Sequence, residues 1–417
     1  MKLILKWAVL AVIILTSFEL SAQDDKIEVN PITVELTRAI GRDIFEYNGV
    51  PFMEPVVMIT NATSNSRFFN SAKIDKDEFY IKFGIHNMFG FVPDDFRTYT
   101  PSLPSEEFNW LEMAKYASYD LSNQKININD TVGLVHYLFK TLLDDGLKDG
   151  SIKLPDTAPT LLGHDSVKLS FPDGVFDSLA RRHELYPLLP EDVKEEVLNI
   201  MNSIPTFFSL PKGANIKSIY APVPQIEFGG FMGSEVILRY IPPMQIDENV
   251  GDFSFWGIAL KHSISQYMHD PWMHIAVQGA YQGTTLENTV GYTNSKFESF
   301  ASIYDFNIHA SKMIEGWFEV YSGFAYEFID IETEFLYYIS VETQQQLGLL
   351  EPGEDYPTPG YPGDQNPQTS YLDLTDSNYK WVIGIKRDIG NLAFFVDYSV
   401  SKYNLFSGGI EYRFDLD

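Results

Sequence analysis

Two short stretches of the chain carry residue types that could do chemistry. Residues 267–274 read YMHDPWMH and place His269, Asp270 and His274 within six positions. Imidazole and carboxylate groups bind zinc, but a metal site needs three or four ligands that converge. His269 and Asp270 fall in a predicted short turn, whereas His274 belongs to the strand that follows. We therefore predict no metal site and no cofactor.

The second stretch is Gly163-His164-Asp165-Ser166. It superficially resembles a hydrolase triad, but triad members converge in space and are rarely neighbours in sequence. The chain has no G-x-S-x-G elbow and no phosphate-binding or dinucleotide-binding fingerprint. An enzyme acting on lipid would also need a nucleophile, a base and an orienting group, and no such set is recognisable. We predict no catalytic residues and no enzymatic activity.

The richest polar set is spread over the second half of the chain. Its members are charged or histidine side chains that share the polar parity of alternating segments, and we predict that they line a lumen: Glu235, Arg239, Lys261, His274, Asp305, His309, Glu319, Glu327, Lys380, Lys386, Asp397, Glu411 and Arg413. One interpretation is a salt-bridge network that stiffens a small barrel, because charges removed from bulk water are usually paired. The other is a polar path or ligand site whose selectivity these charges tune.

The elements that must position these side chains are eight alternating runs that begin near Glu235. In residues 317–329, for example, apolar side chains at even positions oppose Glu319 and Glu327 at odd ones. Such alternation predicts a strand with one apolar face. No charged residue occupies the apolar parity in the body of these runs, and a misplaced Arg or Lys near mid-bilayer would cost about 2–4 kcal/mol. The pattern predicts an all-β fold, a transmembrane antiparallel β-barrel of about 10–14 strands.

The connections between the runs alternate in predicted length. Three are long (Ile241–Asp252, Gly283–Lys296 and Asp330–Asn378) and three are short (Ser265–Pro271, Lys312–Gly316 and Arg387–Gly390). Outer-membrane barrels have short periplasmic turns and long external loops. Placing the C-terminus in the periplasm makes every long connection extracellular.

The front half reads differently. Glu78–Val92 predicts a strand and turn, and Val56–Thr60 and Gln225–Phe231 are weaker strand candidates. Helical spacing is found in Glu106–Tyr119, Val132–Leu147 and Phe176–Ser203. We interpret residues 104–205 as a mainly helical insertion that either plugs the lumen or caps the barrel; the sequence leaves both alternatives open.

The N-terminus reads as a signal peptide over residues 1–22, with Lys2 and Lys6 before an apolar core and cleavage near Ala22. Residues 23–417 then form a single barrel domain. The chain has no cysteine, so disulfides and thiolate sites are excluded. The formal net charge of −27 argues against a nucleic-acid partner, because phosphate binding needs Lys and Arg. It favours either plain solubility or acidic loops that bind divalent cations.

Four segments carry a resemblance to a known family: Phe68–Asp95, Ala221–Pro243, Phe253–Tyr267 and Asp397–Phe414. Together they resemble an uncharacterised family of outer-membrane β-barrels from Bacteroidota-type, Gram-negative bacteria. The family is distantly similar to the long-chain fatty-acid channels of the outer membrane. The resemblance implies a barrel in the outer membrane and transfers no activity.

We therefore expect an outer-membrane, porin-like protein, a passive channel for a small or hydrophobic solute. The alternative is a non-transporting structural or adhesive platform that acts through acidic extracellular loops. The partners expected are outer-membrane lipid and lipopolysaccharide, the barrel assembly machinery and the hydrophobic solute.

Overall fold

Ten strands form a closed antiparallel barrel in the computed structural model, which describes residues 30–76, 78–120, 125–247, 251–290 and 295–416. The predicted signal peptide lies outside the described residues. The order around the ring is β1-β16-β15-β14-β13-β12-β11-β10-β9-β8. The bounds are β1 Tyr80–Phe91, β8 Ser218–Phe231, β9 Ser234–Asp247, β10 Gly251–Ser263, β11 His274–Val290, β12 Ser295–Ile314, β13 Phe318–Tyr337, β14 Gln368–Ile389, β15 Leu392–Val400 and β16 Leu405–Asp415. The predicted all-β barrel with helices in the N-terminal half is confirmed.

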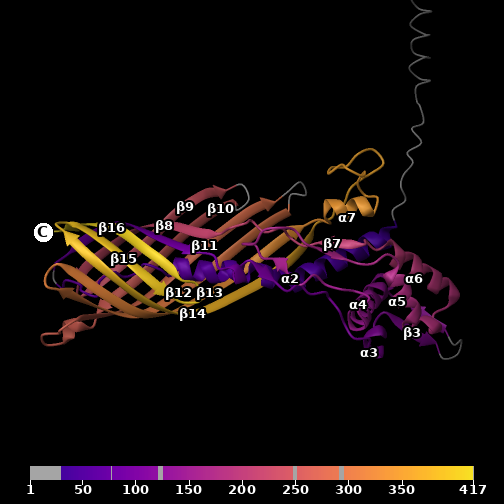
Figure 1. Cartoon of the computed structure of the whole chain (residues 1–417), viewed down its shortest axis with the longest axis horizontal. Coiled ribbons are helices and arrows are strands. Elements are labelled where there is room, and N and C mark those ends of the chain that lie inside the picture. The colour runs from indigo at the N-terminus through magenta and orange to yellow at the C-terminus, as the bar shows by residue number, and fades with distance from the viewer. Residues whose placement is uncertain (1–29, 77, 121–124, 248–250, 291–294, 417) are drawn as a thin grey trace, which may run out of the picture.

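A long helix, α2 (Pro31–Ser64), runs along the barrel axis and ends inside the barrel (Figure 1). Its N-cap is Asn30, whose side chain accepts a hydrogen bond from the backbone N–H of Ile32 at 2.9 Å, and Pro31 occupies the first turn, where a proline is tolerated. Pro51 and Pro55 lie within the helix. The prediction of a strand at Val56–Thr60 is wrong, because these apolar residues are enclosed by the barrel wall as part of a helix.

The segment between β1 and β8 forms a helical subdomain beyond the end of the barrel that is opposite the C-terminus (Figure 1). Its larger elements are α4 (Thr131–Asp149), α5 (Val175–Arg182) and α6 (Glu191–Ser203). Its short ones are η1 (Asp94–Phe96), β2 (Thr98–Tyr99), α3 (Trp110–Met113), β3 (Ala117–Asp120), β4 (Lys125–Ile128), β5 (Ala158–Pro159), β6 (Lys168–Ser170), η2 (Tyr186–Leu188) and β7 (Phe207–Ser209). The predicted helix over Glu106–Tyr119 is reduced to the four residues of α3, because the chain then turns into the β3–β4 hairpin.

The first half of α2 belongs to the core of this subdomain. Leu36, Ile40 and Ile44 are buried in one cluster with side chains of α4, α5 and α6. The second half of α2 packs inside the barrel, where Phe52 and Met53 contact the wall. One helix therefore joins the subdomain to the barrel. None of the helices in the described ranges is both long and apolar enough to cross a membrane.

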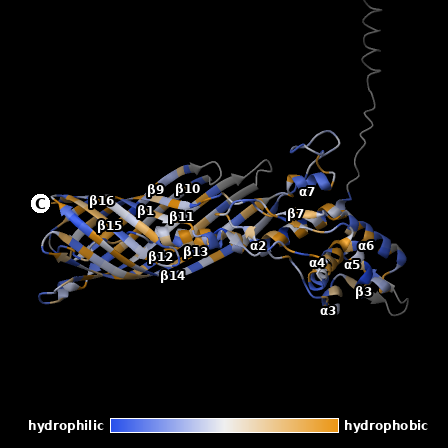
Figure 2. Cartoon of the chain, viewed as in Figure 1, coloured by the Kyte–Doolittle hydropathy of each residue, from blue (hydrophilic) through white to orange (hydrophobic). Residues whose placement is uncertain are grey.

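Several strands are longer than a membrane requires. β12 and β13 have 20 residues each and β14 has 22, whereas a tilted spanning strand needs about 9–11. Along β13 the outward side chains change from Phe324, Tyr326 and Phe328 to Asp330 and Glu332, while the inward ones change from polar to apolar. Hydrophobic residues alternate along the barrel strands (Figure 2). We call the part of the barrel nearest the C-terminus the lower part and the part nearest the helical subdomain the upper part (Figure 1). The wall is therefore apolar outside over its lower part and polar outside over its upper part.

This inversion explains why the predicted long connections are wrong. Most of Ile241–Asp252 and Gly283–Lys296, and both ends of Asp330–Asn378, are strand in the structure. Many of their outward side chains are polar, among them Glu287, Asp330 and Glu332, so the apolar parity that identified the other runs is lost. What remains between β13 and β14 is a loop that carries α7 (Val341–Gln346). Beyond it, η3 (Ser265–Tyr267) occupies the turn between β10 and β11 at the opposite end.

The change from an apolar to a polar outer face along β13 predicts that an arginine is costly at one outward position and tolerated at another. Phe324→Arg places a charge in the apolar band and should lower the free energy of unfolding in lipid vesicles by about 2–4 kcal/mol. Glu332→Arg, eight positions further on the same outward parity, should change it by less than about 0.5 kcal/mol. Denaturant titration followed by tryptophan fluorescence measures both. Equal losses would contradict the assignment of the upper wall to water.

The junction of α2 with α4 predicts a pH dependence. The Asp43 carboxylate lies 2.9 Å from Nε2 of His136 and 3.4 Å from Nζ of Lys140. Burial by itself would raise the pKa of Asp43, but the hydrogen bonds and charges of His136 and Lys140 hold it below the ordinary value of 3.8. A carboxyl with a depressed folded-state pKa stabilises the fold above its unfolded pKa, and that stabilisation is lost as the pH falls through the folded one.

We expect the subdomain to melt at lower temperature at pH about 3 or below than at pH about 6, with this pair accounting for no more than about 1 kcal/mol because its cations remain partly exposed. Far-UV circular dichroism measures the transition. Asp43→Asn should already be destabilised at the higher pH and should lose part of the pH dependence. An unchanged pH dependence would show that other carboxyls govern it.

Candidate functional site

The C-terminal end of α2 is held by cations from two sides of the barrel. A helix end carries unsatisfied carbonyls and a partial negative charge, and α2 has no basic residue in its own last turn. Arg239 on β9 donates to the carbonyls of Ser64 at 2.9 Å and Ser66 at 2.8 Å. Lys380 on β14 donates to the carbonyl of Ala62 at 2.8 Å. β9 and β14 lie five strands apart in the ring of ten, so these cations approach the helix end from opposite walls.

Residues 65–76, which follow α2, continue through the lumen, and we call them the plug segment. At its start Arg67 adopts a left-handed conformation, with φ of 63°. Its guanidinium pairs with Asp397 and donates to the hydroxyl of Tyr321 at 2.7 Å. The next residue is Phe68, and the Cζ atom of the Arg239 guanidinium lies 3.6 Å from the centroid of its ring. Phe69 stacks on His309 at 4.2 Å.

The rest of the plug segment is bonded to further strands. Asn70 donates to Glu411 at 2.5 Å, and the hydroxyl of Ser71 donates to Glu319 at 2.7 Å. At the end nearest the C-terminus, Arg413 pairs with Asp75 at 2.6 Å. The segment therefore fills the lumen by side-chain contacts with several parts of the wall.

Ten of the thirteen side chains predicted from sequence to line the lumen are buried, namely Glu235, Arg239, Lys261, Asp305, His309, Glu319, Glu327, Lys380, Asp397 and Glu411. His274, Lys386 and Arg413 are half-buried. Several are paired: Glu235 with Lys261, Glu327 with Lys380, and Lys386 with Asp388 at 3.2 Å. Asp305 accepts a hydrogen bond from Asn307. Many of these side chains bind the plug segment, so they do not line an open path.

Sequence reasoning missed part of this polar interior. Lys82 and His86 on β1 and Glu227 on β8 are buried in it, and Lys82 pairs with Glu227 at 2.8 Å and Glu235 at 2.7 Å. The signal was available, because Lys82 and His86 share a parity opposite Phe83 and Ile85 in a predicted strand. Arg67 gave no such signal, since it belongs to no repeating element.

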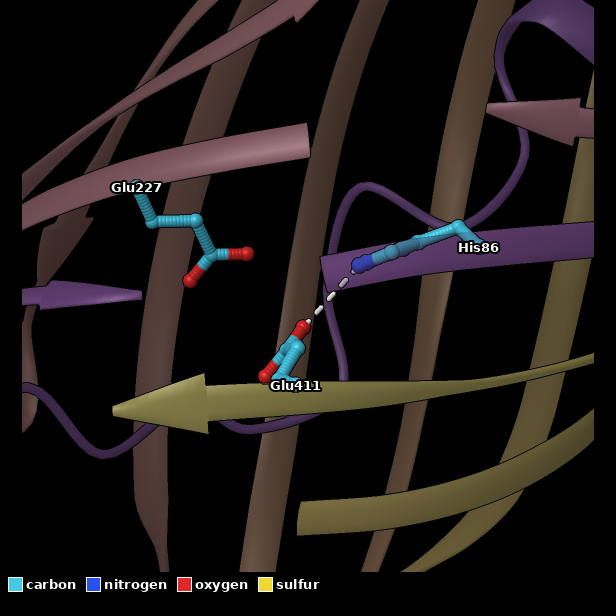
Figure 3. Close-up of side chains that lie close together, drawn as sticks. All are labelled: His86, Glu227 and Glu411. Carbon is cyan, nitrogen blue, oxygen red and sulfur yellow. Dashed lines mark ion pairs between the residues drawn. The ribbon is translucent and has the colours of Figure 1, made fainter. Parts of the chain in front are cut away.

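Three of these side chains come close enough to be considered as metal ligands. Ligand atoms of His86, Glu227 and Glu411 lie within 4.8 Å of one another, and Nε2 of His86 is 3.1 Å from Glu411 (Figure 3). However, Glu227 is bonded to the ammonium of Lys82 and Glu411 to the amide of Asn70. A metal ion would have to displace both partners, so we assign the cluster to packing of the plug.

The two stretches singled out for their residue types are exposed. His269 and Asp270 lie in the turn before β11, and His164, Asp165 and Ser166 lie in a loop of the subdomain. Among the described residues, the grouping of three candidate metal ligands includes none of them.

Above the plug, a cavity of about 1360 Å³ extends beside α2. Its lining along the helix runs from Thr37 to Ser64, roughly 40 Å at the rise of an α-helix. On the other sides it is lined mainly by apolar side chains of β8, β9 and β10, of the loop before β8 and of the loop between β5 and β6, among them Leu161, Val223, Ile241, Phe253 and Phe255. Part of the upper lumen is thus an elongated apolar space that ends beside the last turn of α2.

The plug contacts predict the effect of removing one cation. Lys380→Met leaves Glu327 buried without its ion-pair partner and removes one of the two side-chain donors to the carbonyl of Ala62. The loss should cost about 3–5 kcal/mol. The double variant Glu327→Gln/Lys380→Met should recover part of the loss, because no uncompensated charge remains.

Denaturant unfolding in vesicles measures the stability, and planar-bilayer recording should detect more frequent conductance steps in Lys380→Met as the plug loosens. Lys73→Met, at an exposed position of the plug segment, is the matched control and should behave as the unmodified protein. A single variant as stable as that control would contradict the role of Lys380.

Comparisons with known proteins place the chain in context. Residues 1–414 match one protein family, described as "Family of unknown function (DUF6588)". A search of curated proteins found no match. Among solved structures, the Yersinia pestis attachment invasion locus protein Ail matches at 8% identity and a TM-score of 0.22, over 43% of this chain and 93% of its own. Acinetobacter baumannii OccAB4 matches at 9% identity and a TM-score of 0.12, over 83% of this chain and 100% of its own. These scores carry no functional argument.

Proposed function

Since the chain belongs to the family of unknown function DUF6588, whose description assigns no activity, we propose its function from its geometry. The protein is an outer-membrane barrel that binds a small apolar solute in the cavity beside α2 and lets that solute enter the barrel. The observation that carries the proposal is the cavity itself. Small-molecule sites are typically concave, mostly apolar spaces of about 300–1,000 Å³, and this one is larger and lined mainly by apolar side chains.

The outer surface supports a membrane location. Ile308, Phe324, Ile383 and Ile410 are examples of large apolar side chains that are exposed on the lower wall. Above them lies a row of aromatic side chains in register, in which Trp256 pairs with Tyr240 and Tyr281 with Tyr304. An apolar band bordered by aromatic residues is typical of outer-membrane barrels. With the C-terminus in the periplasm, the helical subdomain and the cavity lie on the external side.

The cavity also has a cover. Ile339 and Thr343, at the start of the loop between β13 and β14, belong to the cavity lining. The loop is tied to α2 by Arg38, which pairs with the buried Asp364 carboxylate at 2.6 Å. This favours a solute-binding role over the alternative of an adhesive platform, because the acidic loop is packed against the cavity.

A glycine of α2 offers a direct test. Gly41 lines the cavity, and a Cβ atom added there would meet nothing within 4 Å. Gly41→Phe should therefore fill the cavity without a clash, and replacing a mid-helix glycine does not by itself destabilise the helix. We expect the affinity for the fluorescent apolar probe N-phenyl-1-naphthylamine to fall at least about tenfold, a loss of roughly 1.4 kcal/mol.

Val50→Phe is the matched control, because Val50 is exposed on the same helix and lies outside the cavity lining. The control should bind the probe as the unmodified protein does. Equal binding by Gly41→Phe and the control would show that the probe does not occupy this cavity.

A further inference from the structure

The neighbouring strands β8 and β9 separate over part of their length. β8 pairs with β9 only from Gln225↔Arg239 to Phe231↔Ser234, although β8 begins at Ser218 and β9 continues to Asp247. Over residues 218–224, β8 is paired with β1 alone, and over 240–247, β9 is paired with β10 alone. Within the described ranges, the other neighbouring strands stay paired over most of the shorter strand. β14 extends past β15 over residues 368–380, but β15 has already ended there, whereas at the β8–β9 seam both strands continue.

Prolines occupy both unpaired edges. Pro222 and Pro224 lie in the free part of β8, and Pro242 and Pro243 in the free part of β9. Proline has no backbone N–H, so it is confined to edge strands and bulges. β9 has register irregularities against β10 over this part. A proline whose ring faces the seam removes a donor that pairing across it would need. These prolines therefore disfavour closure of the seam.

The cavity reaches this seam. Its lining includes the five consecutive residues Ile219 to Val223 of β8. Successive residues of a strand point to opposite faces, and Tyr220 and Pro222 are exposed on the outside whereas Val223 is buried. Outward residues of a fully paired wall would not line an interior space. From the other edge, Met244 is exposed and also lines the cavity.

The seam lies at the level of the membrane surface. It begins just beyond the pair Gln225↔Arg239, next to Tyr240, which pairs with Trp256 in the upper aromatic row. The surfaces on both sides are apolar, from Tyr220 and Pro222 to Met244. An apolar molecule dissolved in the outer leaflet would meet a continuous apolar surface from the lipid to the cavity.

We propose that the gap between β8 and β9 is a lateral portal through which an apolar molecule passes between the outer leaflet of the membrane and the cavity beside α2. This rests on the proposed function, because it assigns a route to the solute that the cavity binds. The portal joins the cavity to the lipid and not to the lumen below, which the plug segment fills.

Bridging the portal provides the first test. The natural chain has no cysteine, so Tyr220→Cys/Met244→Cys can be joined across the gap with a bismaleimide and compared with the same variant blocked by N-ethylmaleimide. In vesicles preloaded with N-phenyl-1-naphthylamine in the bilayer, bridging should slow the transfer of the probe to the cavity at least about tenfold relative to the blocked variant. The matched control is Ile308→Cys/Phe324→Cys, an exposed pair in register across the hydrogen-bonded β12–β13 seam, which should show no effect.

The second test needs only single substitutions. Val223→Cys faces the cavity beside the portal, and Ile237→Cys is equally buried in the paired part of β9. A maleimide attached to the acyl chain of a phospholipid should label Val223→Cys at least about tenfold faster than Ile237→Cys.

The outcomes separate the two proposals. Probe binding with an unchanged transfer rate after bridging, or equal labelling at the two cysteines, overturns the portal and leaves the binding function standing. No probe binding to the unmodified protein overturns the proposed function, and the portal with it.

Discussion

The interior of this barrel depends on the attraction between one helix end and the cations of the wall. α2 delivers the negative end of its dipole to the middle of the lumen, and Arg239 and Lys380 meet it from opposite sides. Charges buried in a barrel need partners, and the last carbonyls of a helix need donors. The two cations and the carbonyls at the end of α2 meet both needs. The plug segment then leaves α2 at Arg67, whose own charge is matched by Asp397.

A change of solvent along the strands divides the protein into two parts. Where the wall is apolar outside, its interior is polar and filled by the plug. Where the outside becomes acidic, as at Asp330 and Glu332, the interior becomes apolar and packs on Phe52 and Met53 of α2. The same ten strands thus enclose a salt-bridged lower half and an apolar upper half. The cavity exists because α2 fills only part of the upper half.

The two proposals follow from this division. A plugged lower lumen argues against free diffusion of water-soluble solutes through the described conformation. An apolar cavity covered by a loop and open at a proline-lined seam instead favours molecules that reside in lipid. The helical subdomain, through the first half of α2, is mechanically continuous with both the cavity and the plug.

The alternation of residues by itself determined the barrel, the polar parity of ten buried side chains and the absence of charge from the apolar face, because a lipid-exposed strand tolerates only one pattern. Lys82, His86 and Glu227 obeyed the same rule and were within its reach. Tertiary structure alone decided the rest. α2 was invisible because its buried residues are not confined to one face, so the helix shows no clear amphipathic period. The strand extensions were hidden because their outward side chains change from apolar to polar partway along. The partners of each charge were decided by which strands are neighbours, as for Glu235 with Lys261, and by the path of the plug segment, as for Arg67 with Asp397. These relations join residues up to several hundred positions apart, and no local pattern encodes them.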